Sequence, residues 1–338
     1  MPAAKRLRIA VLGDGGWGTT LAIHLHRCGH QVRWWGVSPG YLAQMDRRRK
    51  NPKFLPGIRI PRDLPIHPDL AEAAQRAHLV VMAAPSQYLR ATAQRLANAW
   101  RAPAPVLSVA KGLELRTLKR MSQILREELG PIPVAALSGP NIAAEIAKGH
   151  PASSVVASGE ARLAALVQRA FSNAQFRVYT SADLIGVELG GALKNPIAIA
   201  AGIGDGLGFG ANAKAALITR GVVEMARLGV ALGACEHTFW GLSGLGDLVT
   251  TCLGGRNRGL GEQLGKGLSL SHALGSTAMV IEGVGTTKAA LALGRREGIE
   301  LPIMEQVSAV LFHRRSPRRA LHALMSRSRK AEFTRHGG

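Results

Sequence analysis

Cysteine is scarce in this chain of 338 residues. The three cysteines, Cys28, Cys235 and Cys252, form neither a CxxC motif nor an even set for a disulfide framework. This usage fits a reducing cytoplasm and argues against a disulfide scaffold or a cysteine-ligated metal site. No HExxH motif and no Ser-His-Asp arrangement accompanies them, so we predict no metal site and no hydrolase.

Long apolar runs are also missing. No stretch of about 18 uncharged apolar residues occurs, so we predict no transmembrane segment. The first residues, MPAAKRLRIAVLGDGGWG, place basic residues before apolar ones, as a signal peptide does. Asp14 and the glycines interrupt the apolar run after LRIAVLG, which makes it a better first strand. We therefore expect a cytoplasmic protein.

Acidic residues are few: 22 Asp and Glu stand against 43 Lys and Arg, for a formal net charge of +21. A basic balance suggests nucleic-acid binding, but aromatic residues make up only 4% and few can stack on bases. Part of the charge is local, since residues 313–336 hold eight Arg or Lys and one Glu. We do not expect nucleic-acid binding as the main function. A phosphate-bearing small ligand, or loose affinity for anionic surfaces such as membranes, accounts for the charge.

The first half of the chain alternates apolar, β-prone runs with helical stretches. The runs are residues 7–13, 30–36, 78–85, 105–112, 133–140, 153–159 and 175–181. The helical stretches are 19–28, 87–100, 117–129 and 160–172. Several runs are apolar throughout, which is typical of strands covered on both faces. This predicts an α/β fold with a doubly wound, mainly parallel, Rossmann-type sheet, and a Pro-rich loop over residues 38–77.

From about residue 183 onward, Ala, Leu and Gly recur with helical spacing and no strand pattern is found. We therefore predict a dinucleotide-binding domain over residues 1–182 and an all-helical substrate and catalytic domain over 183–326. A basic tail follows at 327–338, with a composition that favours disorder.

A glycine motif follows the first predicted strand. Gly13, Gly15 and Gly18 have G-x-G-x-x-G spacing between that strand and a helix, and the next strand begins at Gln31. Gly13 permits the tight turn, Gly15 lets a pyrophosphate approach, and Gly18 lets the helix pack closely. The motif predicts an NAD or NADP site. At the end of the second strand Val37 offers neither an acid for a ribose hydroxyl nor a base for a phosphate, so the choice stays open.

Basic and amide side chains follow the later strands and lie in the helical half. Ligands of such sheets bind beyond the carboxyl ends of the strands, where Lys111 and the turn at Gly139 are predicted to lie. Lys194 and Asn195 lie among small apolar residues, so Lys194 is either an ordinary cation or a proton-transfer group. Two further clusters hold Asp247, Thr250, Thr251, Arg256, Asn257 and Arg258, and then Glu282.

Together these segments resemble NAD(P)-dependent glycerol-3-phosphate dehydrogenase of the bacterial type, from about residue 8 to about residue 325. The matching stretches are VLGDGGWGTTLA, FLP, AKGLE, SGPNIAAEIAKGHP, DLIGVELGGALKN, GLGFGANAKAALITRGVVEMARLG, GLGDLVTTC, GGRNR and VIEGV. The resemblance implies reversible hydride transfer between NAD(P)H and dihydroxyacetone phosphate, giving sn-glycerol 3-phosphate for glycerophospholipid synthesis.

The resemblance also implies the roles of individual residues. Lys194 would be the general acid in reduction and the base in reverse, with a pKa lowered by desolvation and by Lys111 and partly restored by Asp247. The implied substrate contacts are Lys111, Gly139, Asn141, Lys194, Asp247, Gly255, Arg256 and Asn257. The implied cofactor contacts are Gly13, Gly15, Gly16, Trp17, Gly18, Val37, Lys111, Ala143, Arg256, Val280 and Glu282. NADPH is slightly favoured, and a homodimer is expected, on resemblance alone.

Three positions depart from the family pattern. Val37 stands where bacterial members often carry Arg or His, which weakens an NADP assignment, and Gly16 replaces a usual Ser. Pro196 replaces an aliphatic residue, and a proline removes a helical hydrogen bond. We therefore predict either a kink at Pro196 or a helix that begins near it.

Two other functions stay open. Another two-domain reductase, such as a β-hydroxyacid or 6-phosphogluconate dehydrogenase, would act on a carboxylate, but LGGALKN and GGRNR argue against it. A cofactor-sensing or nucleic-acid-binding protein without turnover would explain the charge, but it would not need Lys111, Lys194, Asp247 and Arg256 together.

Overall fold

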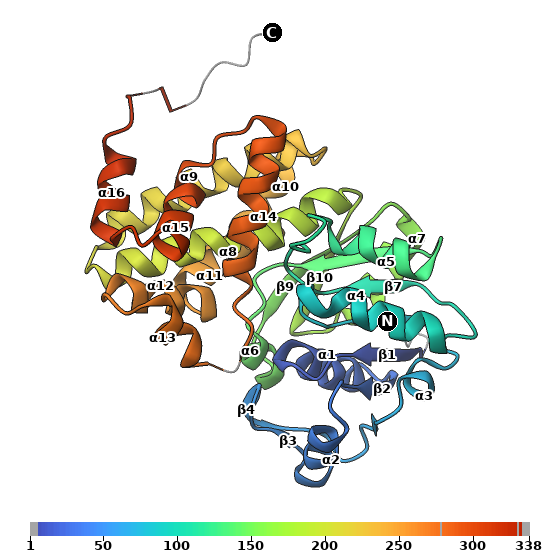
Figure 1. Cartoon of the computed structure of the whole chain (residues 1–338). Coiled ribbons are helices and arrows are strands. Elements are labelled where there is room, and N and C mark those ends of the chain that lie inside the picture. Colours follow the sequence, from blue (N-terminus) through green and yellow to red (C-terminus); the bar gives the residue numbers. More distant parts are fainter. Residues whose placement is uncertain (1–5, 278, 330, 333–338) are drawn as a thin grey trace.

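A single mixed sheet organises the first half of the molecule (Figure 1). The computed structural model describes residues 6–277, 279–329 and 331–332. Eight strands pair in the order β10-β9-β8-β7-β6-β1-β2-β5, and β9 runs antiparallel to β8 while all other neighbours are parallel. The strands are β1 (Arg8–Leu12), β2 (Gln31–Trp35), β5 (Ile66–His67), β6 (Leu79–Met82), β7 (Val106–Ser108), β8 (Val134–Ser138), β9 (Ala152–Ser158) and β10 (Phe176–Ser181).

Helices cover both faces of this sheet, as the apolar central strands β6, β7 and β8 require. One face packs against α1 (Gly16–Arg27), α6 (Ala143–Lys148) and α7 (Ala161–Phe171). The other packs against α3 (Leu70–Ala74), α4 (Ser86–Ala99) and α5 (Met121–Leu129). The predicted doubly wound, mainly parallel sheet followed by a helical domain is confirmed.

The prediction of a loop over residues 38–77 is wrong. This segment forms α2 (Pro39–Arg48), a hairpin of β3 (Lys50–Asn51) and β4 (Leu55–Arg59), the edge strand β5, and α3. Pro39 is the first residue of α2, a position where its fixed φ favours a helix, so here proline begins an element. The Asn51 side chain donates to Asp14 O at 2.8 Å and thereby ties the hairpin to the glycine turn.

The helical half is built around α8 (Leu184–Gly206), whose N-terminus is capped by Asp183 accepting from Gly186 N at 2.8 Å. Around it lie α9 (Ala211–Ala231), α10 (Glu236–Trp240), α11 (Asp247–Leu253), α12 (Arg256–Gly265), α13 (Leu270–Gly275), α14 (Glu282–Glu297), α15 (Pro302–Phe312) and α16 (Pro317–Met325). Glycines bring α12 close to α8, because a Cβ on Gly202 would lie 1.9 Å from Arg258 O and one on Gly261 2.0 Å from Ile199 O. This packing sets α12 beside the segment that carries Lys194.

Pro196 lies inside α8, so a helix that begins near residue 196 is wrong. Pro196 has no N–H, so one helical hydrogen bond is missing there, but the helix of 23 residues continues on both sides of it. A bend at Pro196 stays a prediction. Among the described residues α8 is also the one helix long and apolar enough to cross a membrane. However, 89% of its most apolar window is buried within the protein, as in the core helix of a folded domain.

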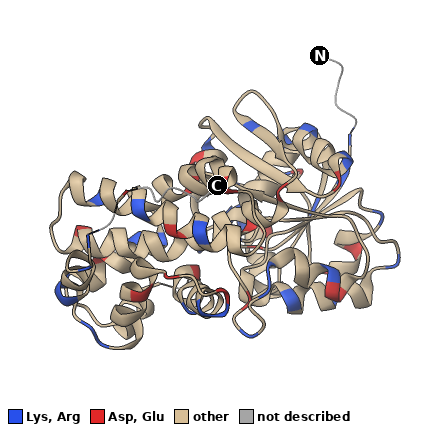
Figure 2. Cartoon of the chain, turned by 90° about the horizontal axis from the view of Figure 1, so that it is seen from above, with Lys and Arg blue, Asp and Glu red and all other residues tan. Residues whose placement is uncertain are grey.

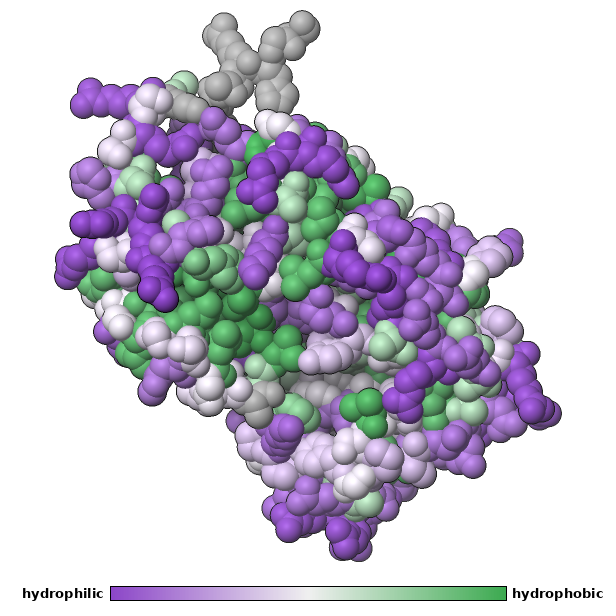
Figure 3. All heavy atoms as spheres, viewed as in Figure 1, coloured by the Kyte–Doolittle hydropathy of each residue, from purple (hydrophilic) through white to green (hydrophobic). Residues whose placement is uncertain are grey.

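Lys and Arg are distributed over both halves of the molecule, as the view from above shows (Figure 2). On the face drawn in Figure 3, apolar side chains reach the surface mainly over the helical half, between hydrophilic side chains. Residues 330 and 333–338 of the predicted basic tail lie outside the described residues.

Candidate active site

The glycine turn between β1 and α1 leaves backbone donors open at the carboxyl edge of the sheet. Gly13 has a φ of 140°, and a Cβ there would lie 2.6 Å from Ala83 O. A Cβ on Gly18 would lie 2.2 Å from Gly13 O, so the helix can start here only with glycine. Gly15 is the N-cap of α1 and gives no side-chain cap, and no atom lies within 4 Å of a Cβ built on it. The first N–H groups of α1 are therefore available to an anion.

Two neighbouring features fit a dinucleotide at this turn. The Nε1 of Trp17 is buried and has no hydrogen-bond partner among the described residues, so it can donate to a bound acceptor. A Cβ on Gly16 would lie 2.5 Å from Phe54 O, so glycine allows the turn to approach the β3–β4 hairpin closely. The residues present therefore suit a pyrophosphate-bearing cofactor.

At the end of β2, Val37 is 62% exposed and offers no polar group. The carboxyl of Asp14 lies against the preceding residue, because a Cβ on Gly36 would be 2.6 Å from Asp14 Oδ2. Burial raises the pKa of Asp14, while Lys53 acts in the opposite direction. Asp14 thus places a carboxyl group beside the end of β2, although the sequence analysis did not name it as a candidate site residue.

Two lysines and one aspartate meet where the two halves of the chain join. Lys194 Nζ donates to Asp247 Oδ1 at 2.7 Å, and Lys111 Nζ donates to Asp247 Oδ2 at 2.7 Å and to Gly139 O at 2.7 Å. Lys194 also donates to Thr251 Oγ1. Lys194 is only 6% exposed and Asp247 only 2%, so this is a buried ion cluster. The pKa of Lys194 is lowered to about 8, chiefly by burial and also by the nearby Lys111 cation, while Asp247 acts in the opposite direction.

A π-helical turn, η1 (Leu242–Gly246), presents Asp247 to the lysines. Glycine is required in it, since a Cβ on Gly244 would lie 2.1 Å from Phe239 O. Glycine is also required opposite it, because a Cβ on Gly190 of α8 would lie 2.8 Å from Ser243 O. Such turns concentrate at functional sites because they redirect a side chain within a helix.

A series of amide hydrogen bonds connects the cluster to two further elements, α12 and α14. Asn195 Nδ2 donates to Lys111 O at 3.1 Å, and Asn195 Oδ1 accepts from Asn257 Nδ2 at 2.8 Å. Asn257 Oδ1 accepts from Gly283 N at 2.9 Å. These bonds therefore fix the relative positions of four segments: the loop of Lys111, α8, α12 and the start of α14.

Arg256 lies beside this series as the first residue of α12. The N-cap Gly255 has a φ of 95° and provides no side-chain cap, so the first N–H groups of α12 are free of one. The exposed guanidinium of Arg256 donates from Nη1 to Val280 O at 2.7 Å. Since Asn257 follows Arg256 and bonds to Asn195, which follows Lys194, the predicted phosphate contact and the predicted acid lie on neighbouring segments.

Glu282, the first residue of α14, connects the helical half to the sheet-containing half. Its carboxylate accepts from Ser86 N at 3.0 Å and from Ser86 Oγ. It also lies beside the Lys111 loop, because a Cβ on Gly112 would be 2.9 Å from Glu282 Oε2. Burial raises the pKa of Glu282, and its bonds to Ser86 act in the opposite direction.

The remaining predicted contacts lie at the edge of this region. Asn141 Oδ1 accepts from Ser154 Oγ at 2.9 Å, so its side chain is bound to β9 and not to the lysine cluster. Ala143 begins α6 and its carbonyl accepts from Thr20 of α1 at 3.0 Å, which sets it beside the glycine turn.

Several residues of the site were not predicted to contact ligands. Thr251 bonds Lys194, and its position four residues after Asp247 on a helix was a usable signal. Asn195 was noted only as the neighbour of Lys194. Ser86 is brought in by tertiary packing across a separation of 196 residues, which no local pattern reveals.

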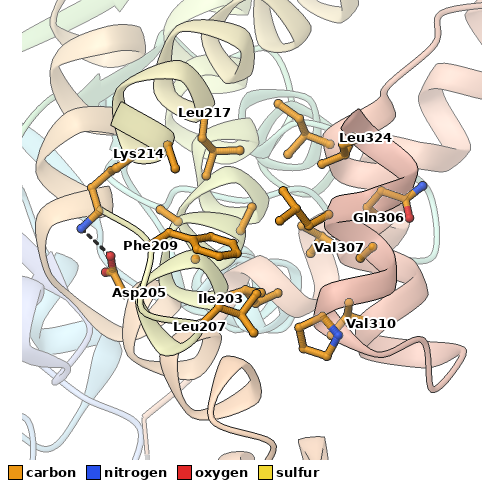
Figure 4. A pocket seen from close by; sticks show the side chains of 18 of the residues that line it. Ile203, Asp205, Leu207, Phe209, Lys214, Leu217, Gln306, Val307, Val310 and Leu324 are labelled. Carbon is orange, nitrogen blue, oxygen red and sulfur yellow. Dashed lines mark ion pairs between the residues drawn. The ribbon is translucent and has the colours of Figure 1, made fainter. Parts of the chain in front are cut away.

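A separate, apolar pocket lies at the C-terminal end of α8 (Figure 4). Ile203, Phe209, Leu217 and Val307 line it, with an ion pair between Lys214 and Asp205 at one side. It offers no acid–base group aimed at its apolar interior, so the lysine cluster is the candidate active site.

Comparison with known proteins gives one consistent family. The family description "NAD-dependent glycerol-3-phosphate dehydrogenase N-terminus" matches residues 8–164, and its C-terminus counterpart matches residues 183–322. The glycerol-3-phosphate dehydrogenase [NAD(P)+] of Citrifermentans bemidjiense is 47% identical over 330 residues, covering 96% of this chain and 98% of its own. That of Fusobacterium nucleatum is 45% identical over 332 residues, covering 97% and 99%.

Solved structures agree with these relatives. The glycerol-3-phosphate dehydrogenase of Coxiella burnetii superimposes with a TM-score of 0.91 at 36% identity, covering 95% of this chain and 99% of its own. The glycerol-3-phosphate dehydrogenase GPD1 of Saccharomyces cerevisiae gives 0.81 at 27% identity, covering 95% and 99%.

Proposed function

The chain belongs to the family of NAD-dependent glycerol-3-phosphate dehydrogenases, and on this basis we propose how its own residues carry out the reaction. The enzyme transfers a hydride between NAD(P)H and dihydroxyacetone phosphate to give sn-glycerol 3-phosphate, reversibly. A carboxylate-specific reductase or a protein without turnover is less consistent with relatives that are this similar over nearly the whole chain.

Lys194 is the proton donor in reduction. When bound, the reduced nicotinamide supplies a hydride to the central carbon, and the carbonyl electron pair moves to its oxygen, which needs a proton. The Lys194 ammonium gives that proton and is left as an amine, which takes a proton back in the oxidative direction. A pKa of about 8 lets both forms be populated near neutral pH, as general acid–base catalysis requires.

Asp247 and Lys111 hold Lys194 in place and set its charge. Asp247 Oδ1 accepts from Lys194 Nζ at 2.7 Å and so holds the ammonium in place. Its negative charge raises the pKa of Lys194 and thereby offsets part of the effect of burial. Lys111 shares the same carboxylate and comes from the nucleotide-binding half, so it can contact substrate and cofactor together. Gly139, whose carbonyl accepts from Lys111, lies beside the cluster, and Asn141 is a proposed substrate contact on family resemblance alone.

The substrate phosphate is bound at the start of α12. Gly255, Arg256 and Asn257 combine free backbone N–H groups, a helix N-terminus and a guanidinium, and each favours a phosphate. The planar guanidinium offers two parallel donors to phosphate oxygens, which a lysine cannot.

The glycine turn would hold the pyrophosphate of the cofactor. Gly13, Gly15, Gly16 and Gly18 of the turn admit the pyrophosphate, with Trp17 Nε1 as an additional donor. The remaining proposed cofactor contacts are Val37 at the end of β2, and Ala143, Val280 and Glu282. Both NADH and NADPH are accepted, as the names of the relatives indicate, and the slight preference for NADPH rests on family resemblance.

The buried cluster of Lys194, Asp247 and Lys111 carries this proposal. Its test is a spectrophotometric assay with dihydroxyacetone phosphate, run separately with NADH and NADPH and compared with simple hydroxyacids. Turnover with the phosphate substrate and not with the hydroxyacids supports the assignment of Arg256 and Asn257. Equal turnover with a carboxylate substrate would contradict it.

A cytoplasmic homodimer of two-domain subunits, divided near residue 182, completes the proposal. Family resemblance supports the dimer, and the few cysteines support the compartment. Light scattering should give about twice the subunit mass of 35.8 kDa, and a mass of one subunit would exclude the dimer.

A further inference from the structure

Two helices of the nucleotide-binding half receive a capping side chain from the helical half. The N-cap of α4 is Pro85 and that of α5 is Arg120, and neither side chain contains an oxygen that could accept the free N–H groups. In both cases a carboxylate from the helical half is an acceptor, and at α5 Gln123 Oε1 also accepts from Arg120 N at 2.9 Å. Glu282 accepts from the first residue of α4, and Glu188 accepts from the second residue of α5.

Glu188 is the one of these two that no proposed ligand contact explains. It is 7% exposed, and its Oε1 accepts from Ser122 N at 2.7 Å. Its Oε2 accepts from Ser122 Oγ at 2.7 Å and from the guanidinium of Arg120. A carboxylate at a helix N-terminus with a paired cation is strongly held, because every one of these bonds is charge-assisted.

These bonds cross from α8 to the nucleotide-binding half six residues before Lys194. The segment between is also tightly packed, since a Cβ on Gly191 would lie 2.6 Å from Ser138 Oγ and 3.4 Å from Lys111 Cγ. The side chains that hydrogen-bond to Lys194 are those of Asp247 and Thr251, and both belong to the helical half. Glu188 therefore fixes α8, and with it Lys194, relative to the half that holds the nicotinamide.

We propose that Glu188 is a positioning residue for the reaction, acting through Lys194. This rests on the proposed role of Lys194 as proton donor. A displacement of about 1 Å between reacting groups can lower a rate by about 100-fold, so the loss of this tie reduces turnover while leaving the binding groups intact.

The chain provides a matched control for a merely structural role. Glu224 is also a buried carboxylate that caps a helix, accepting from Ile303 N at 2.6 Å and Met304 N at 3.3 Å. Both α9, which carries it, and α15, which it caps, belong to the helical half. Glu188→Gln and Glu224→Gln thus each replace a buried, helix-capping carboxyl group with an amide of the same size, and only Glu188 joins the two halves.

The experiment compares steady-state kinetics of these two variants of the full enzyme, with dihydroxyacetone phosphate and NADPH. We expect Glu188→Gln to lower kcat between about tenfold and about 100-fold with both KM values within about twofold. The kinetic isotope effect with C4-deuterated NADPH should rise, because the chemical step becomes slower. Glu224→Gln should keep kcat within about twofold of the natural enzyme. Equal loss of kcat in both variants, or an unchanged kcat in Glu188→Gln, would overturn the proposal.

A second variant separates capping from positioning. Arg120→Asp supplies α5 with a cap of its own, so Glu188→Gln combined with Arg120→Asp should regain melting temperature without regaining kcat. Recovery of kcat together with stability would overturn the proposal. Lys194→Ala separates the proton-donor role of Lys194 from the positioning role of Glu188. Normal turnover in that variant refutes the proton-donor role. Loss of turnover there, with normal turnover in Glu188→Gln, refutes only the positioning role.

Discussion

Asp247→Asn changes one charge in the candidate site and almost no volume. The carboxylate accepts from Lys194 and from Lys111, each at 2.7 Å, and it opposes the burial and the second cation that lower the pKa of Lys194. In the variant the two lowering influences remain and the opposing one is lost. We therefore expect the pKa of Lys194 to fall further.

The size of this fall follows from the geometry. An adjacent opposite charge shifts a pKa by about 1–3 units, so the pKa of Lys194 should move from about 8 to roughly 5–7. At pH ~7.5 a group with a pKa of about 8 is roughly three-quarters protonated, whereas one with a pKa of about 6 is roughly 3% protonated. The acid required for reduction is thus reduced about 25-fold at that pH, in addition to any direct loss of substrate contact.

The assay measures kcat for reduction of dihydroxyacetone phosphate between pH ~5.5 and ~9.5 at saturating NADPH. In the natural enzyme kcat should fall as pH rises through about 8, and in the oxidative direction it should rise over the same range, since the amine is then the active form. In Asp247→Asn the fall of kcat in reduction and its rise in oxidation should both move to lower pH. A transition that stays near 8, with only a pH-independent loss of rate, would refute the reasoning.

Three further predictions concern binding, packing and stability. Arg256→Lys replaces a planar pair of donors with one point charge, so KM for dihydroxyacetone phosphate should rise about tenfold in steady-state assays, and an unchanged KM would exclude Arg256 from the phosphate site. Gly18→Ala places a Cβ 2.2 Å from Gly13 O, so the free energy of unfolding in urea should fall by about 1–3 kcal/mol and NADH binding should weaken; a variant as stable as the natural protein would contradict this. Burial raises the pKa of Glu224 from 4.5 to about 8, so the folded protein keeps a proton that the unfolded chain releases. Its contribution to stability should therefore decline as pH rises between these values, by up to about 1.4 kcal/mol per pH unit, and Glu224→Gln should lack that decline when urea unfolding is compared at pH ~6 and ~8.

The sheet was predictable because several of its strands are continuously apolar and are separated by helical stretches, a pattern typical of a sheet covered on both faces. The hairpin after α2 was not, because β3 has two residues and β4 contains a proline and a glycine, so neither shows alternation. It is held by a tertiary contact, the bond from Asn51 to Asp14.

The chemical groups of the site were visible in the sequence, but their partners were only partly so. A lysine among small apolar residues indicates desolvation, and family resemblance supplied its role. The contacts of Glu188 with Ser122 and of Glu282 with Ser86 join residues 66 and 196 positions apart. Such pairs depend on how the two halves pack, so no local pattern reports them.

The most direct test of the account is the turnover number of Lys194→Ala for dihydroxyacetone phosphate reduction, measured on folded protein with its NADPH affinity checked. Proton transfer by a positioned group contributes about 10²–10⁴-fold, so we predict a loss of kcat in that range with NADPH affinity unchanged. A kcat near that of the natural enzyme would contradict the central claim that the buried Lys194 moves the proton.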